Sequence, residues 1–219
     1  MNASVKPRRK PSQARARMTT GAIQDAFVLA LAASGYERAS MREIASIAGV
    51  GLGTLYLYFP NKDSIAAVTV NSWMRRHAQR MKSAMTERPD STLRERADAM
   101  VRACAEELFS QPGPWRAVLI LERRLTAPEV YQAMYQQHVQ IVAEALAGAC
   151  DWPARQDAHP VASFAFCISE AALRNALLVH ETLPAMEPFT ASIQQAVRAA
   201  IEHALGLGMN TVGVRCGET

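Results

Sequence analysis

The stretch GVGLGTLYLYFP, residues 49–60, decides how the N-terminal part of this chain folds. Glycines stand at alternate positions, Gly49, Gly51 and Gly53, and a cluster of aromatic residues follows them. Such glycine spacing occurs in loops that cradle a phosphate and also in the tight turn between two DNA-reading helices. The residues on either side of the glycines separate these two interpretations.

A capped helix precedes the glycines. Ser40 and Glu43 form an S-x-x-E capping box, in which the serine oxygen and the glutamate carboxylate each accept from a free backbone N–H. A dinucleotide-binding loop instead needs a strand before G-x-G-x-x-G, and Thr54 occupies the place of its last glycine. With a second short helix over about 52–58, the segment is predicted to be a helix-turn-helix. The alternative is an ordinary helical hairpin, but residues 56–58 are too apolar for a solvent face and the helix is too short to bury them all.

Composition and charge point to a helical protein with a polyanionic partner. Hydrophobic residues make up 49% of the 219 residues but aromatic residues only 6%, which favours an all-α fold. The net charge is +4, yet residues 1–62 carry nine Lys or Arg and three Asp or Glu, which is +6 and leaves −2 for the rest. A basic N-terminal end suggests binding to nucleic acid.

Residues 23–65, IQDAFVLALAASGYERASMREIASIAGVGLGTLYLYFPNKDSI, resemble the N-terminal domain of the tetracycline-repressor (TetR) family of bacterial regulators. The resemblance covers about forty positions without a gap, and beyond residue 80 it is architectural only. It implies that the helix from Leu52 lies in the major groove of operator DNA. Further implied contacts with bases or phosphates come from Arg42, Gly53, Thr54, Tyr56, Tyr58 and Lys62.

Three positions depart from the family pattern. Gly51 replaces a frequent serine, which removes one hydroxyl contact to phosphate but leaves an acceptable helix cap. Leu52 and Leu57 cannot hydrogen-bond to DNA. Both leucines either pack on thymine methyl groups or rest on neighbouring helices, and the sequence leaves the two possibilities open.

The basic N-terminal segment is a second candidate for contact with DNA. Its cations could lie along phosphates or enter a minor groove, or the segment could be a solvated tail. They are Lys6, Arg8, Arg9, Lys10, Arg15 and Arg17.

The rest of the chain is expected to form a second helical domain. Helices are predicted over about 62–86, 92–109, 115–125, 128–149, 161–181 and 189–206, separated by breaks that contain proline. Resemblance to the family implies that 161–181 and 189–206 form a homodimer interface, and a monomeric bundle is the alternative. The expected divisions are a disordered basic arm (1–16), a helix-turn-helix domain (17–62), a regulatory and dimerisation domain (63–208) and an irregular tail (209–219).

The family also implies a cavity for an unknown small-molecule effector. Candidate lining residues are Trp73, His77, Met100, Cys104, Trp115, Phe164, Cys167 and Asn175, although for each of them ordinary core packing is the favoured interpretation. Glu170 and Arg174 stand four residues apart as a helix pair, a cross-dimer bridge or a ligand contact, with the plain helix pair favoured. The histidines are scattered and no C-x-x-C occurs, so no metal site and no cofactor is expected.

Enzyme motifs are absent from the sequence, including G-x-S-x-G and H-E-x-x-H. The apolar stretch over 161–179 contains Glu170, Arg174 and Asn175, so a membrane span is not expected, and the chain is expected to be cytoplasmic. We therefore expect a ligand-responsive repressor that binds a palindromic operator as a dimer. The alternative is a helical small-molecule-binding protein or enzyme in which the helix-turn-helix is only scaffold.

Overall fold

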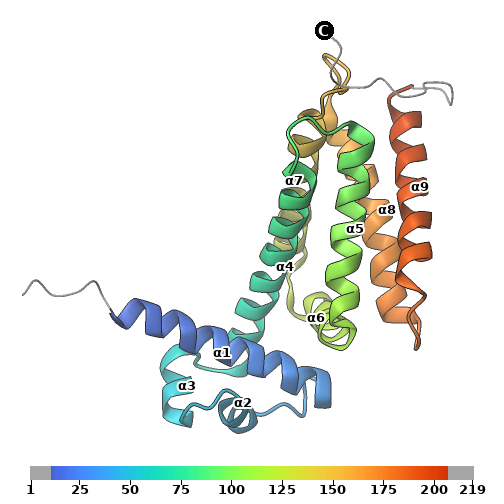
Figure 1. Ribbon diagram of the computed structural model, residues 1–219. Coiled ribbons are helices and arrows are strands. Elements are labelled where there is room, and N and C mark those ends of the chain that lie inside the picture. Colours follow the sequence, from blue (N-terminus) through green and yellow to red (C-terminus); the bar gives the residue numbers. More distant parts are fainter. Residues whose placement is uncertain (1–10, 207–219) are drawn as a thin grey trace, which may run out of the picture. The chain divides into compact units, whose positions relative to one another are not determined.

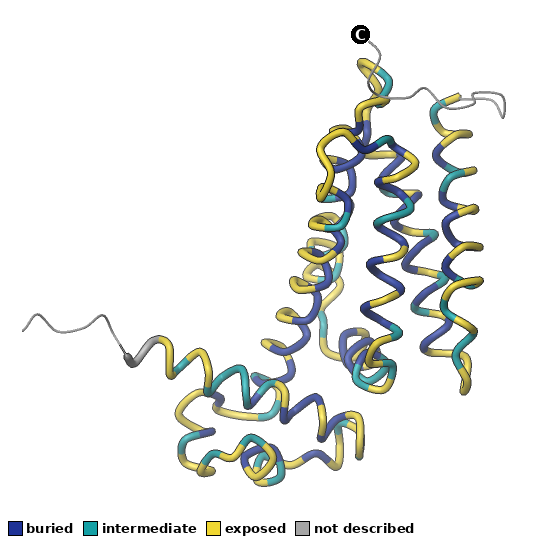
Figure 2. The backbone as a smooth tube through the Cα atoms, in the orientation of Figure 1, coloured by how far each residue is buried: buried dark blue, intermediate teal, exposed yellow. Residues whose placement is uncertain are grey.

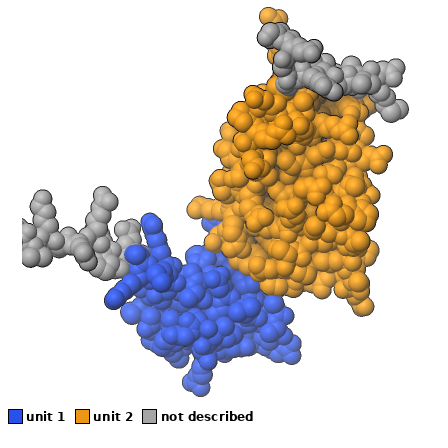
Figure 3. Space-filling view, viewed as in Figure 1, with its two compact units in different colours: residues 1–71 blue, residues 72–219 orange. Residues whose placement is uncertain are grey.

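A computed structural model describes residues 11–206, and within them the chain forms nine α-helices and no strand. The predicted all-α class is therefore confirmed. The chain divides into two compact units, residues 1–71 and 72–219 (Figure 3). The division falls inside a helix and not after residue 62, because the helix that begins there runs on without a break.

Unit 1 contains three helices and the beginning of a fourth (Figure 1). They are α1 (Pro11–Ser34), α2 (Met41–Ile47), α3 (Leu52–Tyr58) and the first residues of α4 (Lys62–Thr86). α2 packs against both α1 and α3. The core between them is apolar and includes Ile23, Phe27, Ile44, Leu55 and Ile65, each fully buried.

Helix α1 begins earlier than the sequence predicts. Residues 11–16 were expected to belong to the disordered arm, but they are helical. Proline is favoured in the first turn of a helix, and Ala14 and Ala16 have high helix propensity, so local preference supports the longer helix. Residues 1–10, with four of the arm's cations, and the expected tail at 209–219 lie outside the described residues.

The start of α2 has the predicted capping box. The backbone N–H of Glu43 donates to the Ser40 hydroxyl at 3.2 Å, and the backbone N–H of Ser40 donates to the Glu43 carboxylate at 3.4 Å. Gly49, directly after α2, has a φ of +65°, a conformation that favours glycine and turns the chain toward α3. The two short helices and their turn are therefore specified by residues close in sequence.

Unit 2 is a helical bundle built around α8 (Figure 1). Besides the remainder of α4, its helices are α5 (Leu93–Ser110), α6 (Pro112–Leu125), α7 (Pro128–Ala147), α8 (Ala158–Val179) and α9 (Met186–Ala204). α8 packs against α5, α6, α7 and α9. Figure 2 shows buried residues recurring along one side of each of these helices.

Three helices of unit 2 begin earlier than predicted, and one of them, α9, begins at Met186 although the sequence placed its start at residue 189. The sequence favours a break over 111–114, but Pro112 stands in the first turn of α6, where its missing N–H costs no hydrogen bond. α8 begins at Ala158 inside the predicted loop over 151–160, because Asp157 caps it by accepting from the backbone N–H of His159 at 3.0 Å.

Arginine side chains connect the helices of unit 2. Arg96 on α5 is 5% exposed and donates to the backbone carbonyls of Ala145 and Pro89, at 2.7 and 2.8 Å. Arg116 on α6 donates to the carbonyls of Leu177 and His180 at the end of α8, at 2.5 and 2.8 Å. Carbonyls at a helix end have no partner within the helix, so Arg116 also caps α8.

One described helix, α8, is long and apolar enough to cross a membrane when length and composition alone are considered. Half of its most apolar window is buried inside the unit. It also carries Glu170 and Arg174. These features are typical of the central helix of a bundle.

Candidate functional site

The first candidate site is the outer face of α3. Leu55 is fully buried and holds the helix to the core, whereas four large side chains face outward. Their exposed fractions are 37% for Leu52, 49% for Tyr56, 84% for Leu57 and 38% for Tyr58. A seven-residue helix that exposes four large apolar or aromatic side chains presents a surface suited to a partner.

The glycines of this segment leave that face open. Gly51 is the N-cap of α3 without a side-chain cap, so the backbone N–H groups of its first turn remain available. At Gly53 a Cβ atom would meet nothing within 4 Å, so a partner can approach the backbone there. Thr54 is half-buried on the same turn, and Arg42 on α2 and Arg17 on α1 are exposed.

Lys62 differs from its expected role of holding a phosphate. Its ammonium donates to the backbone carbonyls of Tyr36 at 2.5 Å, Ala39 at 3.0 Å and Glu37 at 3.4 Å. It also lies 4.3 Å from the centroid of the Tyr36 ring. The three N–H donors are thus occupied within unit 1, and Lys62 fastens the start of α4 to the loop between α1 and α2. The sequence could not show this role, because the carbonyls lie more than twenty residues away.

The second candidate site is a cavity of about 180 Å³ in unit 2, formed by α4, α6, α7 and α8. It is lined by Met74, Glu122, Arg123, Tyr131, Met134, Tyr135, His138, Phe166, Cys167, Glu170, Ala171 and Arg174. An engineered cavity of about 150 Å³ can hold benzene, so this one has room for a small organic molecule.

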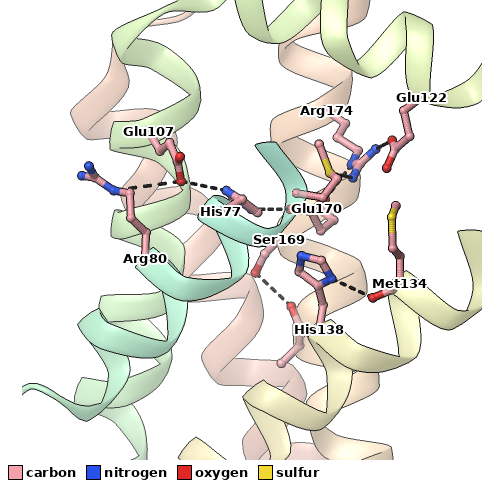
Figure 4. Close-up of polar contacts among 11 residues, drawn as sticks. His77, Arg80, Glu107, Glu122, Met134, His138, Ser169, Glu170 and Arg174 are labelled. Atoms are coloured by element: carbon pink, nitrogen blue, oxygen red, sulfur yellow. Dashed lines mark hydrogen bonds and ion pairs between the residues drawn. The ribbon is translucent and has the colours of Figure 1, made fainter. Parts of the chain in front are cut away.

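A buried ionic group forms one wall of the cavity (Figure 4). Arg174 donates through Nε to Glu170 and through Nη1 to Glu122, both at 2.5 Å. The side chains of Glu122 and Glu170 are only 1% and 9% exposed. Burial raises the pKa of Glu170, but Arg174 and His77 outweigh it and hold that pKa far below its usual range. Glu170 is therefore ionised.

His77 on α4 extends this group away from the cavity. Its Nε2 lies 3.3 Å from Glu170 and its Nδ1 lies 3.0 Å from Glu107, and all three side chains are buried. Burial alone would lower the pKa of His77, but Cys104, Glu107 and Glu170 together raise it well above its ordinary value. The imidazole is thus held as a cation between two carboxylates.

Aromatic rings form another part of the lining. Phe166 lies 5.3 Å from the ring of Tyr135 and stacks on His138 at 5.5 Å. The Nδ1 of His138 lies 2.7 Å from the carbonyl of Met134, and burial lowers the pKa of this histidine, so it stays neutral. Burial also raises the pKa of Tyr135. Both titratable rings are therefore uncharged near pH 7.

Residues 23–68 match the family model described as bacterial regulatory proteins, tetR family. The match contains α2, α3 and the open face of α3. The match identifies this segment as the N-terminal domain of the TetR family.

A curated relative and several solved structures resemble this chain. The fatty acid metabolism regulator protein of Bacillus subtilis (strain 168) is 38% identical over 66 residues, which is 30% of this chain and 34% of that protein. The aligned region thus spans about a third of the relative's length.

Solved structures share the fold over nearly their full length. The fatty acid degradation regulator FadR from Bacillus halodurans has a TM-score of 0.69 at 19% identity, covering 87% of this chain and 96% of that one. FadR from Bacillus subtilis in complex with stearoyl-CoA has a TM-score of 0.67 at 21% identity, covering 83% and 98%. A putative TetR-family regulator from Mesorhizobium loti has a TM-score of 0.69 at 18% identity, covering 89% and 98%. At these identities the likeness concerns the fold.

Most effector-pocket residues predicted from the sequence do not line the cavity. Of the eight, Cys167 lines it. Phe164 is 60% exposed and Asn175 is also exposed, and neither lines this cavity. The other five are buried, and Trp73 and Trp115 pack edge-to-face with centroids 4.8 Å apart. Trp73, Met100 and Trp115 are ordinary core, whereas His77 belongs to the buried ionic group and Cys104 lies beside it.

The lining residues that the sequence missed come from four helices. Glu170 and Arg174 do pair as their spacing predicts, but Arg174 also binds Glu122, 52 residues away. The only signal in the sequence was a charged pair inside its most apolar helix, where an ion pair needs further partners to be stable.

Tertiary structure also gathers possible metal ligands that the sequence did not suggest. One ligand atom each from His77, Cys104 and Glu170 lies within 4.8 Å of the others. Both ring nitrogens of His77 already have carboxylate partners, and Glu170 is shared with Arg174. His77 and Glu170 therefore already have charged hydrogen-bond partners within the chain, and we interpret the cluster as a hydrogen-bonded ionic group.

Proposed function

We propose that this chain is a DNA-binding transcriptional repressor that binds a palindromic operator as a homodimer and releases it when a small molecule binds unit 2. The main observation that supports this proposal is the open face of α3. Thr54, Tyr56 and Tyr58 offer hydroxyl groups for bases and phosphates, and Leu52 and Leu57 offer apolar contact with thymine methyl groups. Arg42 and Arg17 add exposed cations on the neighbouring helices. Such a protein works in the cytoplasm, where the operator is.

A dimer accounts for apolar side chains that α8 leaves uncovered. Phe164, Leu178 and Val179 are 60%, 43% and 70% exposed. We propose that α8 and α9, within 161–181 and 189–206, pack against the same helices of a second chain. Two recognition helices about 34 Å apart can then read successive major grooves on one side of the duplex. A single seven-residue helix offers too few contacts for a specific site.

Helix α4 is the proposed connection between effector and DNA. It is one continuous helix whose first turn is fastened by Lys62 in unit 1 and whose Met74 lines the cavity in unit 2. A molecule in the cavity that binds more tightly to one position of α4 than to another shifts the helix toward that position. The factor by which it then changes the affinity for DNA equals the factor by which DNA changes the affinity for the molecule. Stearoyl-CoA is the ligand of the Bacillus subtilis neighbour. Here the cavity of about 180 Å³ suits a molecule far smaller than a long acyl chain.

The test is selection of bound fragments from the source genome by the purified full-length chain at near-physiological salt. We expect a few sites that share a palindrome with half-sites about one helical turn apart. The double variant Tyr56→Ala/Tyr58→Ala should lose these sites and keep its helical circular dichroism, because both side chains are exposed. Diffuse, strongly salt-dependent binding without a shared sequence would contradict the proposal.

A further inference from the structure

One buried carboxylate oxygen at the cavity lacks a hydrogen-bond partner. Glu122 on α6 is 1% exposed, and its Oε2 accepts from Arg174 at 2.5 Å. Its Oε1 is buried and has no partner among the described residues. Buried polar atoms are rarely left unpaired, because water no longer compensates them. Since Glu122 lines the cavity, a group that enters the cavity can supply the missing donor.

The charges at this wall favour a donor that is also a cation. Glu122 and Glu170 share the single guanidinium of Arg174. The next cation, His77, bonds to Glu170 and Glu107 and has no contact with Glu122. Glu107 is also approached from outside by the half-exposed Arg76 and Arg80, at 3.8 and 4.0 Å. Of the three carboxylates, Glu122 therefore has the fewest cationic partners among the described residues.

The aromatic wall suits the same kind of ligand. Rings of Tyr131, Tyr135 and Phe166 line the cavity together with the neutral imidazole of His138. The electron-rich faces of aromatic rings attract organic cations, and ammonium ligands are often held between such rings and a carboxylate. Arg123 already lies over the ring of Tyr131, 4.8 Å from its centroid, so one ring of this wall makes a cation contact within the chain itself.

We propose that the cavity binds a small molecule whose protonated amine donates to Oε1 of Glu122 and whose apolar body packs against Tyr135 and Phe166. Its size matches a single ring with a short amine arm, given the volume of about 180 Å³. This inference deepens the proposed function, because it names the chemical class of the effector. Amine binding itself does not depend on DNA and is measured without it.

The experiment compares three probes of nearly equal size on the full-length chain at pH 7. Benzylamine is a cation, benzyl alcohol a neutral donor and benzoate an anion. Isothermal titration calorimetry and thermal shift are measured without DNA. We expect benzylamine to bind about tenfold more tightly than benzyl alcohol, since a charge-assisted hydrogen bond is roughly twice as strong as a neutral one. Benzoate should bind more weakly than either.

Matched variants locate the site. Glu122→Gln should remove the preference for the amine, whereas Glu144→Gln, which changes an exposed glutamate on α7, should keep it. Tyr135→Leu keeps the ionic group and should weaken all ring-bearing probes, and it serves as the second test if Glu122→Gln does not fold. The inference is overturned if benzyl alcohol or benzoate binds as tightly as benzylamine, or if Tyr135→Leu leaves binding unchanged.

DNA release is measured separately, with an operator fragment from the genomic selection. Amine binding without DNA release would support the amine site but contradict its role as the effector site. Specific operator binding without any preference for the amine would support the proposed repressor function and contradict the proposed amine site.

Discussion

Replacing Arg174 by methionine tests whether the ionic group at the cavity stabilises the folded chain. Methionine keeps much of the length of the side chain but removes every donor. Glu122, 1% exposed, then loses its one described partner, and Glu170 keeps only His77. Breaking a buried ion pair by removing one partner costs about 3–5 kcal/mol. Because Glu170 retains a cation, we expect a loss near the lower end, about 3 kcal/mol.

Urea unfolding followed by circular dichroism measures this loss. Wild type and variant are compared at pH 7 and at equal protein concentration, since association contributes to apparent stability. The midpoint should fall while the dependence of free energy on urea stays the same. For a chain of this size the melting temperature should drop by roughly 6–12 °C.

A matched substitution separates the buried pair from an ordinary one. Arg102 pairs with Glu187 at 3.3 Å, but these side chains are 47% and 68% exposed. Arg102→Met should therefore cost less than about 1 kcal/mol. Adding Glu122→Gln to Arg174→Met should recover part of the loss, because the uncompensated buried charge is then neutral. If Arg174→Met costs no more than Arg102→Met, the ionic group contributes no stability and the reasoning fails.

Other predictions concern the cap of α2, the charge of His77, the recognition helix and the dimer. Ser40→Ala should destabilise unit 1 by about 1 kcal/mol in urea unfolding, with Ser46→Ala in the same helix as the control. Since the pKa of His77 is raised on folding, its charged form stabilises the chain below about pH 6.5, and that contribution is lost as the pH rises through the folded-state pKa. The difference in unfolding free energy between wild type and His77→Gln should therefore shrink from pH 6.5 upward, and a constant difference would argue against a charged imidazole. Leu57→Ala should lose a thymine preference at one position of each half-site in selection from a randomised operator, and unchanged base preferences would mean that Leu57 makes no specific contact. Phe164→Asp should give a monomer in size-exclusion chromatography with light scattering, and a dimer of unchanged stability would place the interface elsewhere.

Unit 1 could be predicted from the sequence in most of its detail, because its signals are local. The capping box joins residues three apart, Gly49 sets its own backbone angle, and Leu55 and Ile44 follow helical spacing. These short-range interactions form whenever the two short helices form, so they do not depend on the rest of the fold. Lys62 is the exception, since its carbonyl partners come from the loop after α1.

The position and lining of the cavity in unit 2 follow only from the tertiary structure. Its walls come from α4, α6, α7 and α8, and a cavity is the space that packed helices leave between them. The periodicity of a single helix does not reveal that space. Of the residues chosen as aromatic or sulfur-containing, Cys167 lines the cavity and the others are core or surface. Glu170 and Arg174 were visible as a pair because four residues bring them onto one helix face. Glu122 became their partner only when α6 packed against α8, because a buried arginine must find acceptors wherever the fold provides them.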